Sequence, residues 1–596
     1  MLKAETLKIF QMKNKFSDVY KKGSILLCGM ISLFSCSLKE YNPGGTTADV
    51  VFAAQEGMNA LVNSAYVNYG GQFYGREDIV MLTEGGTDLW INIANGGYGR
   101  QMTKYEELTA STGQIRNTWN RLYEIINYCN AGIERIDGVP YNSADEKKAR
   151  KGELHFLRAY SYWHIVEFYG GVDLRTKETK TAVLTAQRSP VAAFYDLMLQ
   201  DVDAAITNLP VDPVPTTDIG RATLKAAYGL KARIALTRVA YESSQAEKDK
   251  YYQIAKEAAM YVINNQATLK VSLYNNPADV FSAANNKNNK EAMFVVTHST
   301  ISSLNPQPNN PNRLHMWYKA KYSAKAGMVQ DFTYGNDNNA KSGSMCLMPT
   351  RHLLELYDEQ VDARYRAWFR EEYYLNKASY SWTADDLAAF EKPASMVGTA
   401  ISSGQLALLY TKQKIADKRN KPYAVVDIDD TYNGDRVSAN ARFNICFPSL
   451  LKFNDPNLPT PNSSFGTKDV FVMRFPEMYF IAAECELMMS GGSKTKAIEL
   501  INVIRKRAAV AGKENDMLIS ESQLTQDFLL DEKARELCGE HLRWFDLKRT
   551  GKLYDYVKAY NKDIPLIQPF HVLRPIPQMF LDAITNAAEF GQNTGY

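Results

Sequence analysis

The chain has 596 residues and a formal net charge of +3, with 45% hydrophobic and 23% charged residues. These fractions are typical of a folded protein and exclude a disordered or collagen-like chain, while the small net charge gives no reason to expect a nucleic-acid partner. The length exceeds the roughly 250–300 residues at which one hydrophobic core stops growing, which predicts several core units or a repeat architecture.

Residues 1–35 have the pattern of a secretory signal peptide. Six lysines precede an apolar run over residues 23–35, which is shorter than the roughly 17–25 apolar residues of a transmembrane helix. The alternatives are a membrane anchor or a buried helix, and the sequence allows a start at Met1 or at Met12. Because this leader carries a net charge of +4, the mature chain is close to neutral, at −1.

The apolar run ends in LFSC, which resembles a bacterial lipobox with Cys36 as the residue to be lipidated. Acyl chains gain about 0.8 kcal/mol per buried methylene, so several chains hold a protein firmly at a bilayer. We therefore expect lipidation at Cys36 and a polar, Gly-rich tether over residues 36–50.

Residues 51–270 have the apolar periodicity of helices. In the helix predicted over residues 189–210, Ser189 is the expected N-cap, with Pro190 at the first helical position. Helices of about 15–25 residues at a spacing of roughly 34–40 residues favour a TPR-like repeat. The predicted helices cover residues 119–136, 144–171, 189–210, 221–241 and 251–265.

Residues 271–470 are rich in Asn, Ser, Pro and Gly and predict loops with small sheets. Strands are expected within AMFVVTH (292–298) and YAVVDI (423–428), and one helix at about 350–359. Long ordered loops in a folded domain usually serve function, which indicates a ligand-binding region here.

Helices return in residues 471–596 and complete the helical scaffold, beginning with a hairpin over residues 474–510. One further helix is expected over residues 530–548, and it carries many charges. Carboxylates at i, i+4 spacing could form a general-acid pair, but weak surface ion pairs are favoured. The expected pairs are Glu532 with Arg535, Glu536 and Glu540 with Arg543, and Asp546 with Lys548 or Arg549.

Seven segments in order resemble the SusD/RagB family, the surface nutrient-uptake lipoproteins of Bacteroidota. Two positions depart from the family's pattern: Lys533 stands where Arg is usual, and His541 where Gly is usual. The segments are ELHFLRAYSYWHIVEFYGGVDL, GRATLKAAYGLKARIAL, MPTRHLLELYDEQVDARYRAWF, RFPEMYFIAAECEL, AIELINVIRKRA, DEKARELCGEHLRWFDLKRTGKL, and LRPIPQ followed by FGQNTGY.

The resemblance implies a mainly α fold, in which a TPR-like helical scaffold carries a loop-rich half with short strands. It further implies a non-enzymatic protein at the outer membrane that binds oligosaccharide and delivers it to a SusC-like TonB-dependent transporter. A peptide-binding RagB-like protein is the alternative within the family. A surface glycosidase and a TPR scaffold that binds no nutrient are alternatives from other classes.

Aromatic residues on polar loops are the candidate ligand site, because flat rings desolvate the apolar face of a sugar while polar groups bind its hydroxyls. Such residues occur in TEGGTDLWINIANGGYGRQ and in NRLHMWYKAKY. The alternative for both tryptophans of these segments is packing of a loop onto the scaffold. The predicted ligand-binding residues are Trp90, Asn92, Tyr98, Arg100, Trp317, Tyr318 and Tyr322, whereas Trp119, Trp163 and Trp544 lie on helical stripes and should be core.

No catalytic motif, metal site or cofactor is predicted. The widely spaced cysteines form neither a CxxC motif nor a disulfide framework, and Cys129, Cys485 and Cys538 fit helical cores. Residues 429–434 imitate the start of a calcium loop, but position 12 would be Asn440 where such a loop needs Glu. A hydrogen-bonded turn is favoured there, although a looser Ca²⁺ site is left open.

Overall fold

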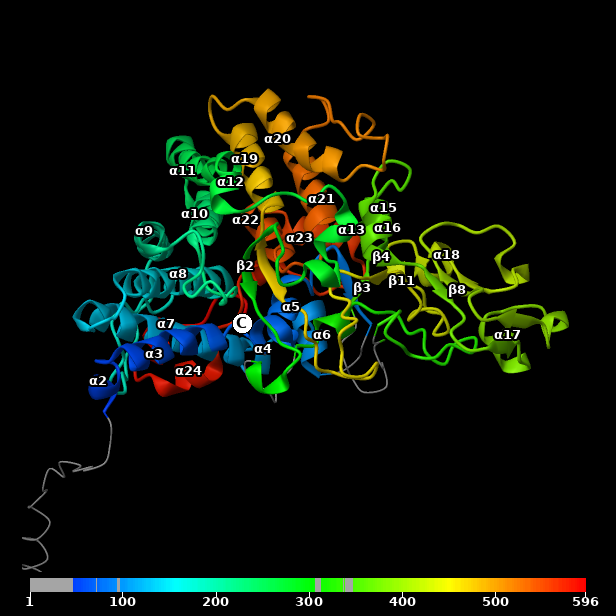
Figure 1. The fold of residues 1–596 in the computed structure, drawn as a ribbon, viewed down its shortest axis with the longest axis horizontal. Coiled ribbons are helices and arrows are strands. Elements are labelled where there is room, and N and C mark those ends of the chain that lie inside the picture. Colours follow the sequence, from blue (N-terminus) through cyan, green and yellow to red (C-terminus); the bar gives the residue numbers. More distant parts are fainter. Residues whose placement is uncertain (1–46, 71, 94–96, 306–311, 336, 338–346) are drawn as a thin grey trace, which may run out of the picture. The chain divides into compact units, whose positions relative to one another are not determined.

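Helices from both ends of the sequence pack side by side in the computed structural model (Figure 1). The structure describes residues 47–70, 72–93, 97–305, 312–335, 337 and 347–596. The chain divides into two units, Met1–Val51 and Phe52–Tyr596, and of the first only α2 (Ala48–Val51) and its preceding residue are described. The predicted signal peptide and the lipidation site Cys36 therefore lie outside the described residues.

The second unit contains long helices in its first and last parts and short ones between them. Their bounds are α3 (Gln55–Val67), α4 (Gln72–Gly75), α5 (Glu77–Thr83), α6 (Gly97–Lys104), α7 (Gly113–Arg135), α8 (Ala144–Tyr169), α9 (Val191–Asn208), α10 (Leu224–Arg238), α11 (Gln245–Asn264), α12 (Gln266–Leu269), α13 (Pro277–Val280), α14 (Leu314–Trp317), α15 (Arg351–Glu355), α16 (Arg364–Trp368), α17 (Ala384–Ala389), α18 (Ile428–Thr431), α19 (Pro476–Met488), α20 (Lys494–Arg507), α21 (Gln526–Leu537), α22 (Arg543–Arg549), α23 (Leu553–Tyr560), α24 (Gln578–Ala583) and α25 (Ala587–Phe590).

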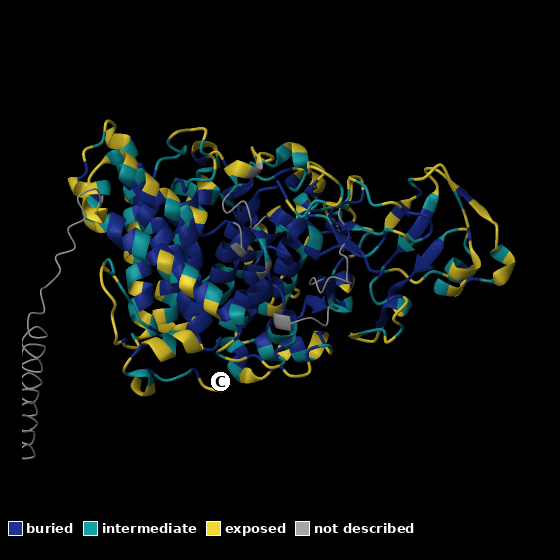
Figure 2. Cartoon of the chain, turned by 90° about the horizontal axis from the view of Figure 1, so that it is seen from below, coloured by how far each residue is buried: buried dark blue, intermediate teal, exposed yellow. Residues whose placement is uncertain are grey.

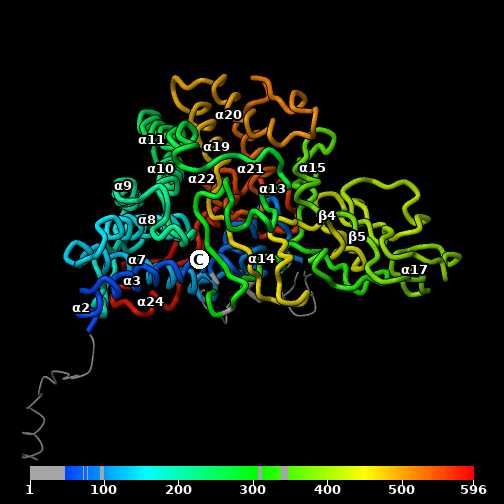
Figure 3. Tube along the Cα trace, viewed as in Figure 1, coloured from blue at the N-terminus to red at the C-terminus, as the bar shows by residue number. Residues whose placement is uncertain are grey.

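The long helices form a row in which each packs against the next. The order is α3, α7, α8, α9, α10, α11, α19 and α20, so two C-terminal helices extend the N-terminal series. In Figure 3, α24 lies along α3 and α7, where the ring of Phe580 meets that of Trp119 at 4.8 Å between centroids. The mainly helical fold with a scaffold drawn from both ends of the chain is confirmed.

One predicted helix start is wrong by a residue. Pro190, and not Ser189, occupies the cap position of α9, and its side chain offers no cap hydrogen bond. The backbone N–H of Ser189 instead donates to the carbonyl of Val172 at 2.9 Å, which ties the preceding loop to the end of α8.

Short strands form sheets of two or three strands, as expected for the loop-rich part. The predicted strands at 292–298 and 423–428 are present as β2 and β9, and the helix predicted at 350–359 is the shorter α15. The strands are β1 (Trp90–Asn92), β2 (Ala292–Val296), β3 (Leu347–Pro349), β4 (Phe369–Arg370), β5 (Glu372–Tyr374), β6 (Ser379–Ser381), β7 (Ala400–Ser402), β8 (Leu406–Tyr410), β9 (Ala424–Val426), β10 (Tyr432–Asn433), β11 (Arg436–Val437), β12 (Ser449–Leu450) and β13 (Val470–Arg474).

Two of these sheets bring distant segments together. β1 pairs antiparallel with β3, and β2 pairs antiparallel with β13. The β2–β13 pair packs on α10 at Gly229, where an added Cβ would come within 2.3 Å of the Met473 sulfur. This close approach sets the position of β2, which lines the cleft described below.

The predicted turn at 429–435 is confirmed as the β10–β11 hairpin, with Gly434 in the left-handed region at φ +59°. Neighbouring carboxylates are neutralised by cations: Asp429 lies 2.8 Å from Lys414 and Asp430 lies 2.7 Å from Arg419. Over the described residues, no three His, Cys, Asp or Glu side chains are grouped so that they could hold a metal ion.

One hydrophobic core joins the helical scaffold to the loop-rich part (Figure 2). The predicted core residues Trp119, Trp163 and Trp544 are buried in it, and so are Trp368 and Trp382. Among the described cysteines, Cys129, Cys446, Cys485 and Cys538 are free and buried, as predicted for three of them.

The single helix predicted over 530–548 is wrong: α21 ends at Leu537 and α22 begins at Arg543. Gly539 and His541 take left-handed conformations, with φ +81° and +66°. An L side chain in this region costs roughly 1–2 kcal/mol, which explains why glycine suits the position that His541 fills here. Glu84 holds the break, because its carboxylate accepts the N–H of Gly539 at 3.2 Å and of His541 at 2.7 Å.

The charges of this segment are buried, contrary to the expected surface pairs. Two expected pairs are confirmed, Glu532 with Arg535 and Asp546 with Arg549, each at 2.8 Å. Arg543 is the expected partner of Glu536 and Glu540. It instead binds Asp88, which lies between α5 and β1, at 2.5 Å.

Two buried arginines hold the remaining carboxylates. Arg474 contacts Glu540 at 2.6 Å and Glu536 at 3.2 Å, and Arg364 contacts Glu532 at 2.8 Å and the other oxygen of Glu536 at 3.2 Å. The side chains of both arginines are 0% exposed. The helix face is therefore a structural ion network that joins α21 to β13 and α16.

Candidate functional site

The two segments that carry the predicted ligand residues meet in space. Trp90 on β1 and Tyr318 after α14 make an edge-to-face contact with 4.6 Å between ring centroids. The Trp90 indole N–H donates to Glu84 at 2.9 Å. Burial raises the pKa of Glu84 to about 7, while this bond and the two backbone N–H donors favour its carboxylate.

The rings at this meeting point are core residues, which corrects the expectation of exposed sugar platforms. Trp90 is 0% exposed, and Trp317, Tyr318 and Tyr322 are at most 3% exposed. Tyr322 donates its hydroxyl to the carbonyl of Gly335 at 2.6 Å. The alternative weighed for the tryptophans, packing of loops onto the scaffold, describes their placement.

The other predicted residues divide in exposure. Asn92 is buried at the end of β1, whereas Arg100 on α6 is half-exposed and pairs with Glu106 at 3.3 Å. Tyr98 belongs to α6, but its side chain lies outside the described part. Arg100 is therefore a predicted ligand residue with a charged group that is accessible to solvent.

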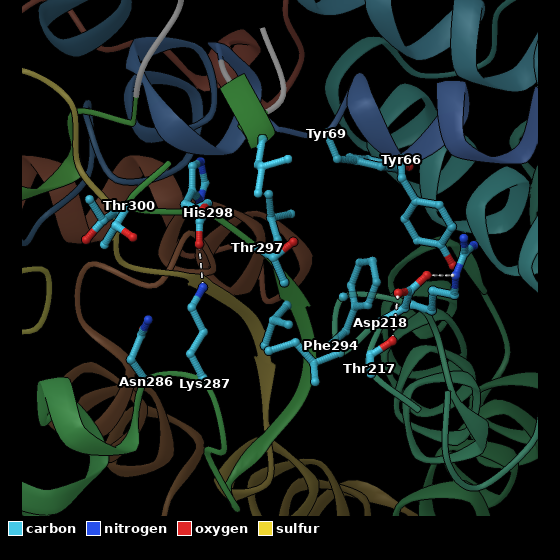
Figure 4. Close-up of a pocket in the computed structure, with 18 of the residues that line it drawn as sticks. Tyr66, Tyr69, Thr217, Asp218, Asn286, Lys287, Phe294, Thr297, His298 and Thr300 are labelled. Carbon is cyan, nitrogen blue, oxygen red and sulfur yellow. Dashed lines mark hydrogen bonds and ion pairs between the residues drawn. The ribbon is translucent and has the colours of Figure 1, made fainter. Parts of the chain in front are cut away.

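A cleft of about 800 Å³ lies elsewhere, between the helical scaffold and the loop-rich part (Figure 4). Its volume falls within the range of roughly 300–1,000 Å³ that is usual for ligand sites. It is lined by residues from the end of α3, the loop 217–221 before α10, the segment around 283–287, the strand run 294–300, and Leu304, Asn457 and Thr467.

One wall of the cleft is fixed by Arg221. Its guanidinium donates to Asp218, Glu153 and Asn63, each at 2.9 Å, and lies 5.9 Å above the ring of Tyr66. The Tyr66 hydroxyl in turn accepts the N–H of Ala222 at 3.0 Å. Because the charged groups around Arg221 are paired with one another, this wall of the cleft is rigid and nearly neutral.

The opposite wall is fixed by Lys287 and Asp469. The ammonium contacts the carboxylate at 2.5 Å and also donates to the backbone carbonyl of His298. Asp469 further accepts the N–H of His298 at 2.8 Å. The strand run 294–300 is therefore held from behind by a buried carboxylate.

His298 is the unusual lining residue. It is 4% exposed, and neither ring nitrogen meets a hydrogen-bond partner among the described residues. Burial lowers the pKa of His298 to about 4, so the ring is neutral at pH 7 and offers one donor and one acceptor. Unpaired buried polar atoms are rare in native proteins and call for an explanation.

The chemistry of the cleft suits binding rather than catalysis. Thr217, Asn286, Thr297, Thr300 and Asn457 supply hydroxyl and amide groups to its walls. Among the described lining residues, Asp218 is the single carboxylate, so the paired acids of glycoside hydrolysis are not assembled here.

A second cavity of about 620 Å³ lies in the loop-rich part, with no lining residue in common with the cleft. Arg370 and Glu372 line it, and Tyr374 at its edge is 42% exposed. The cleft is larger and richer in Asn and Thr, and we treat it as the candidate site.

Sequence reasoning did not single out the residues that line the cleft. The Asn-rich segment NNPADVFSAANNKNN and the strand AMFVVTH carry part of it, and these were the available signals. No helix in the described part of the chain is both long enough and apolar enough to cross a membrane.

Comparison with known proteins covers nearly the whole chain. A family model described as the SusD family matches residues 314–596, and one described as "Starch-binding associating with outer membrane" matches residues 46–236. The SusD-like protein P25 of Formosa agariphila is 24% identical over 92% of this chain and 94% of its own length. The starch-binding protein SusD of Bacteroides thetaiotaomicron is 22% identical over 80% of this chain and 77% of its own length.

Solved structures show the same fold. Surface glycan-binding protein A from Bacteroides thetaiotaomicron, solved in complex with laminarihexaose, superposes with a TM-score of 0.61 at 18% identity. The match covers 91% of this chain and 99% of that one. On the two family models and these relatives, the chain belongs to the SusD/RagB family.

Proposed function

We propose that the protein captures oligosaccharides at the cell surface and delivers them to a SusC-like TonB-dependent transporter in the outer membrane. The cleft carries this proposal: its size, its hydroxyl and amide lining and its fixed walls suit a preformed site for a polyhydroxylated ligand. Support comes also from the relative named as starch-binding and from the structural neighbour solved with laminarihexaose.

The proteins of this family are non-enzymatic binding proteins, and this chain is likewise a binding protein and not an enzyme. Binding to a preformed cleft requires no chemical step, and the ion pairs of Arg221 and Lys287 fix both walls before the ligand arrives. Such pre-organisation favours affinity because little side-chain freedom is lost on binding.

A glycan panel tests the proposal. With the full mature chain carrying Cys36→Ser, calorimetry should show saturable binding of at least one neutral oligosaccharide, with no release of reducing sugar. Peptide mixtures of similar size serve as the comparison. Binding of peptides without binding of any glycan would instead establish the RagB-like alternative, and sugar release would establish an enzyme.

The lipid anchor has its own test. We propose that Cys36 is acylated after signal removal, which supports attachment to the outer membrane through buried acyl chains. Cys36→Ala should move the protein from the membrane fraction to the soluble fraction while its glycan binding stays unchanged. Retention of the variant in the membrane fraction would contradict the anchor.

A further inference from the structure

The exposed apolar surface of the cleft is aliphatic. Three large apolar side chains at its rim face solvent: Leu304 is 68% exposed, Val67 is 40% exposed and Ile219 is 37% exposed. They come from the short helix before residue 305, from the end of α3 and from the loop 217–221. These three residues form an aliphatic rim beside the hydroxyl and amide groups that line the cleft.

Two of the aromatic rings that line the cleft, those of Phe294 and Tyr69, offer no free face for sugar stacking. Phe294 is 4% exposed and Tyr69 is 1% exposed, because both pack into the core. Phe294 meets the ring of Phe156 edge-on at 4.9 Å between centroids. Tyr66 is half-buried, and the guanidinium of Arg221 lies over its ring. Figure 4 shows Tyr66 and Phe294 on one side of the cleft and His298 on the other.

Branched aliphatic side chains do not provide a flat surface for a pyranose ring, but they pack closely around a methyl group. An acetyl substituent carries one methyl group together with a carbonyl that accepts hydrogen bonds. The hydroxyls of Thr297 and Thr300 line the same cavity and can supply the donor.

We propose that the cleft selects glycans that carry acetyl groups, with the methyl packed against the aliphatic rim and the carbonyl bound by the threonine hydroxyls. This inference rests on the proposed glycan-binding function. It names a feature of the ligand that amide-linked and ester-linked acetyl groups share.

Matched glycan pairs test the acetyl preference by calorimetry. Chitohexaose and cellohexaose have the same β-1,4 backbone and differ by the acetamido group; O-acetylated xylan and its alkali-deacetylated form differ by the ester. Burying one methyl is equivalent to about a fourfold gain in affinity, so two acetyl contacts should give roughly 15-fold. The pair that shows the preference identifies the linkage.

Rim variants locate the preference. Ile219→Thr and Leu304→Asn remove the aliphatic surface at similar size and should erase the difference between the paired glycans. The affinity ratio of each pair is measured within one variant, so that any general effect of the substitution on glycan binding cancels. Val397→Thr and Leu566→Asn are the controls, since these residues are 55% and 49% exposed and do not line the cleft. Unchanged melting temperatures should confirm that all four variants fold.

Each outcome separates the inference from the function. Equal affinity for both members of each pair, or a preference that survives in the rim variants, overturns the acetyl inference while glycan binding stands. Binding of peptides in place of every glycan tested overturns both.

Discussion

Replacing Arg474 by Met should lower the free energy of unfolding by about 3–5 kcal/mol. Arg474 is fully buried and contacts Glu540 at 2.6 Å, Glu291 at 2.7 Å and Glu536 at 3.2 Å. Met fills much of the same space but leaves these carboxylates with less compensation inside the core. Removing one partner of a buried ion pair is costly because the other charge stays desolvated.

The pH dependence of stability follows from the same contacts. Burial alone would raise the pKa of Glu536, but Arg507, Arg474, Arg364 and Lys452 hold it at about 2. A glutamate in an unfolded chain titrates near 4.3. Because the folded pKa lies below the unfolded one, the stabilisation is present above about pH 4.3 and is lost as the pH falls toward 2.

Urea unfolding followed by tryptophan fluorescence at pH 7 and at pH 3 measures both effects. The Arg474→Met variant should lose less stability than wild type between these pH values, because the pKa of Glu536 rises without its partner. Arg366→Met is the matched control: its side chain is 75% exposed, lies 3.6 Å from Glu359, and should change stability by at most about 0.5 kcal/mol. A loss below about 1 kcal/mol in Arg474→Met would show that the network is not what holds α21 to β13.

Local patterns predict the helical scaffold but not the partners of its charges. Glu532, Glu536 and Glu540 recur every fourth residue, so the sequence places them on one face of a helix. Their main partners, Arg364 and Arg474, come from α16 and β13, far away along the chain. Sequence spacing gives no information on such long-range contacts. From the sequence alone, a helix face with many buried charges therefore looks the same as one that is exposed to solvent.

The break between α21 and α22 was not predictable for a related reason. A single glycine, Gly539, is tolerated inside many helices, and His541 gives no sign of a left-handed backbone. The conformation depends on Glu84, more than 450 residues away, which accepts both backbone N–H groups.

The candidate site also depends on contacts between segments that are far apart in the sequence. The sequence identifies the segments around Trp90 and Tyr318, and the structure brings them into contact. Trp90 is buried where its ring packs against Tyr318 and its indole N–H binds Glu84, which also accepts backbone N–H groups of Gly539 and His541. The cleft instead depends on residues such as Val67, Ile219 and Thr300, whose types are unremarkable singly and become a site when three distant segments converge.

A reversible block of the cleft should reduce glycan affinity by at least about 100-fold, an effect of about 2.7 kcal/mol. Thr300 is exposed on the cleft wall in Figure 4 and is suitable for a single cysteine. In the mature chain, without residues 1–35 and with Cys36→Ser and Cys346→Ser, Thr300→Cys can be modified with a bulky, non-aromatic methanethiosulfonate. The modification fills the cavity without adding a ring on which a sugar could stack.

The remaining thiols should not react, which makes the label selective. Cys129, Cys446, Cys485 and Cys538 are buried, and burial raises the pKa of each of them. A buried thiol with a raised pKa holds little thiolate, the form that attacks the reagent. Mass spectrometry of the labelled protein should therefore show one adduct per chain.

Reduction with dithiothreitol should restore binding to the level of the unlabelled variant, which distinguishes a steric block from misfolding. Val397→Cys, labelled in the same way, is the control because Val397 is 55% exposed and lies outside the cleft lining. If the labelled Thr300→Cys protein binds glycan as tightly as the labelled control, the ligand occupies another surface. The second cavity beside Tyr374 and the exposed region of Arg100 would then be the places to label next, because in both a described polar side chain reaches solvent.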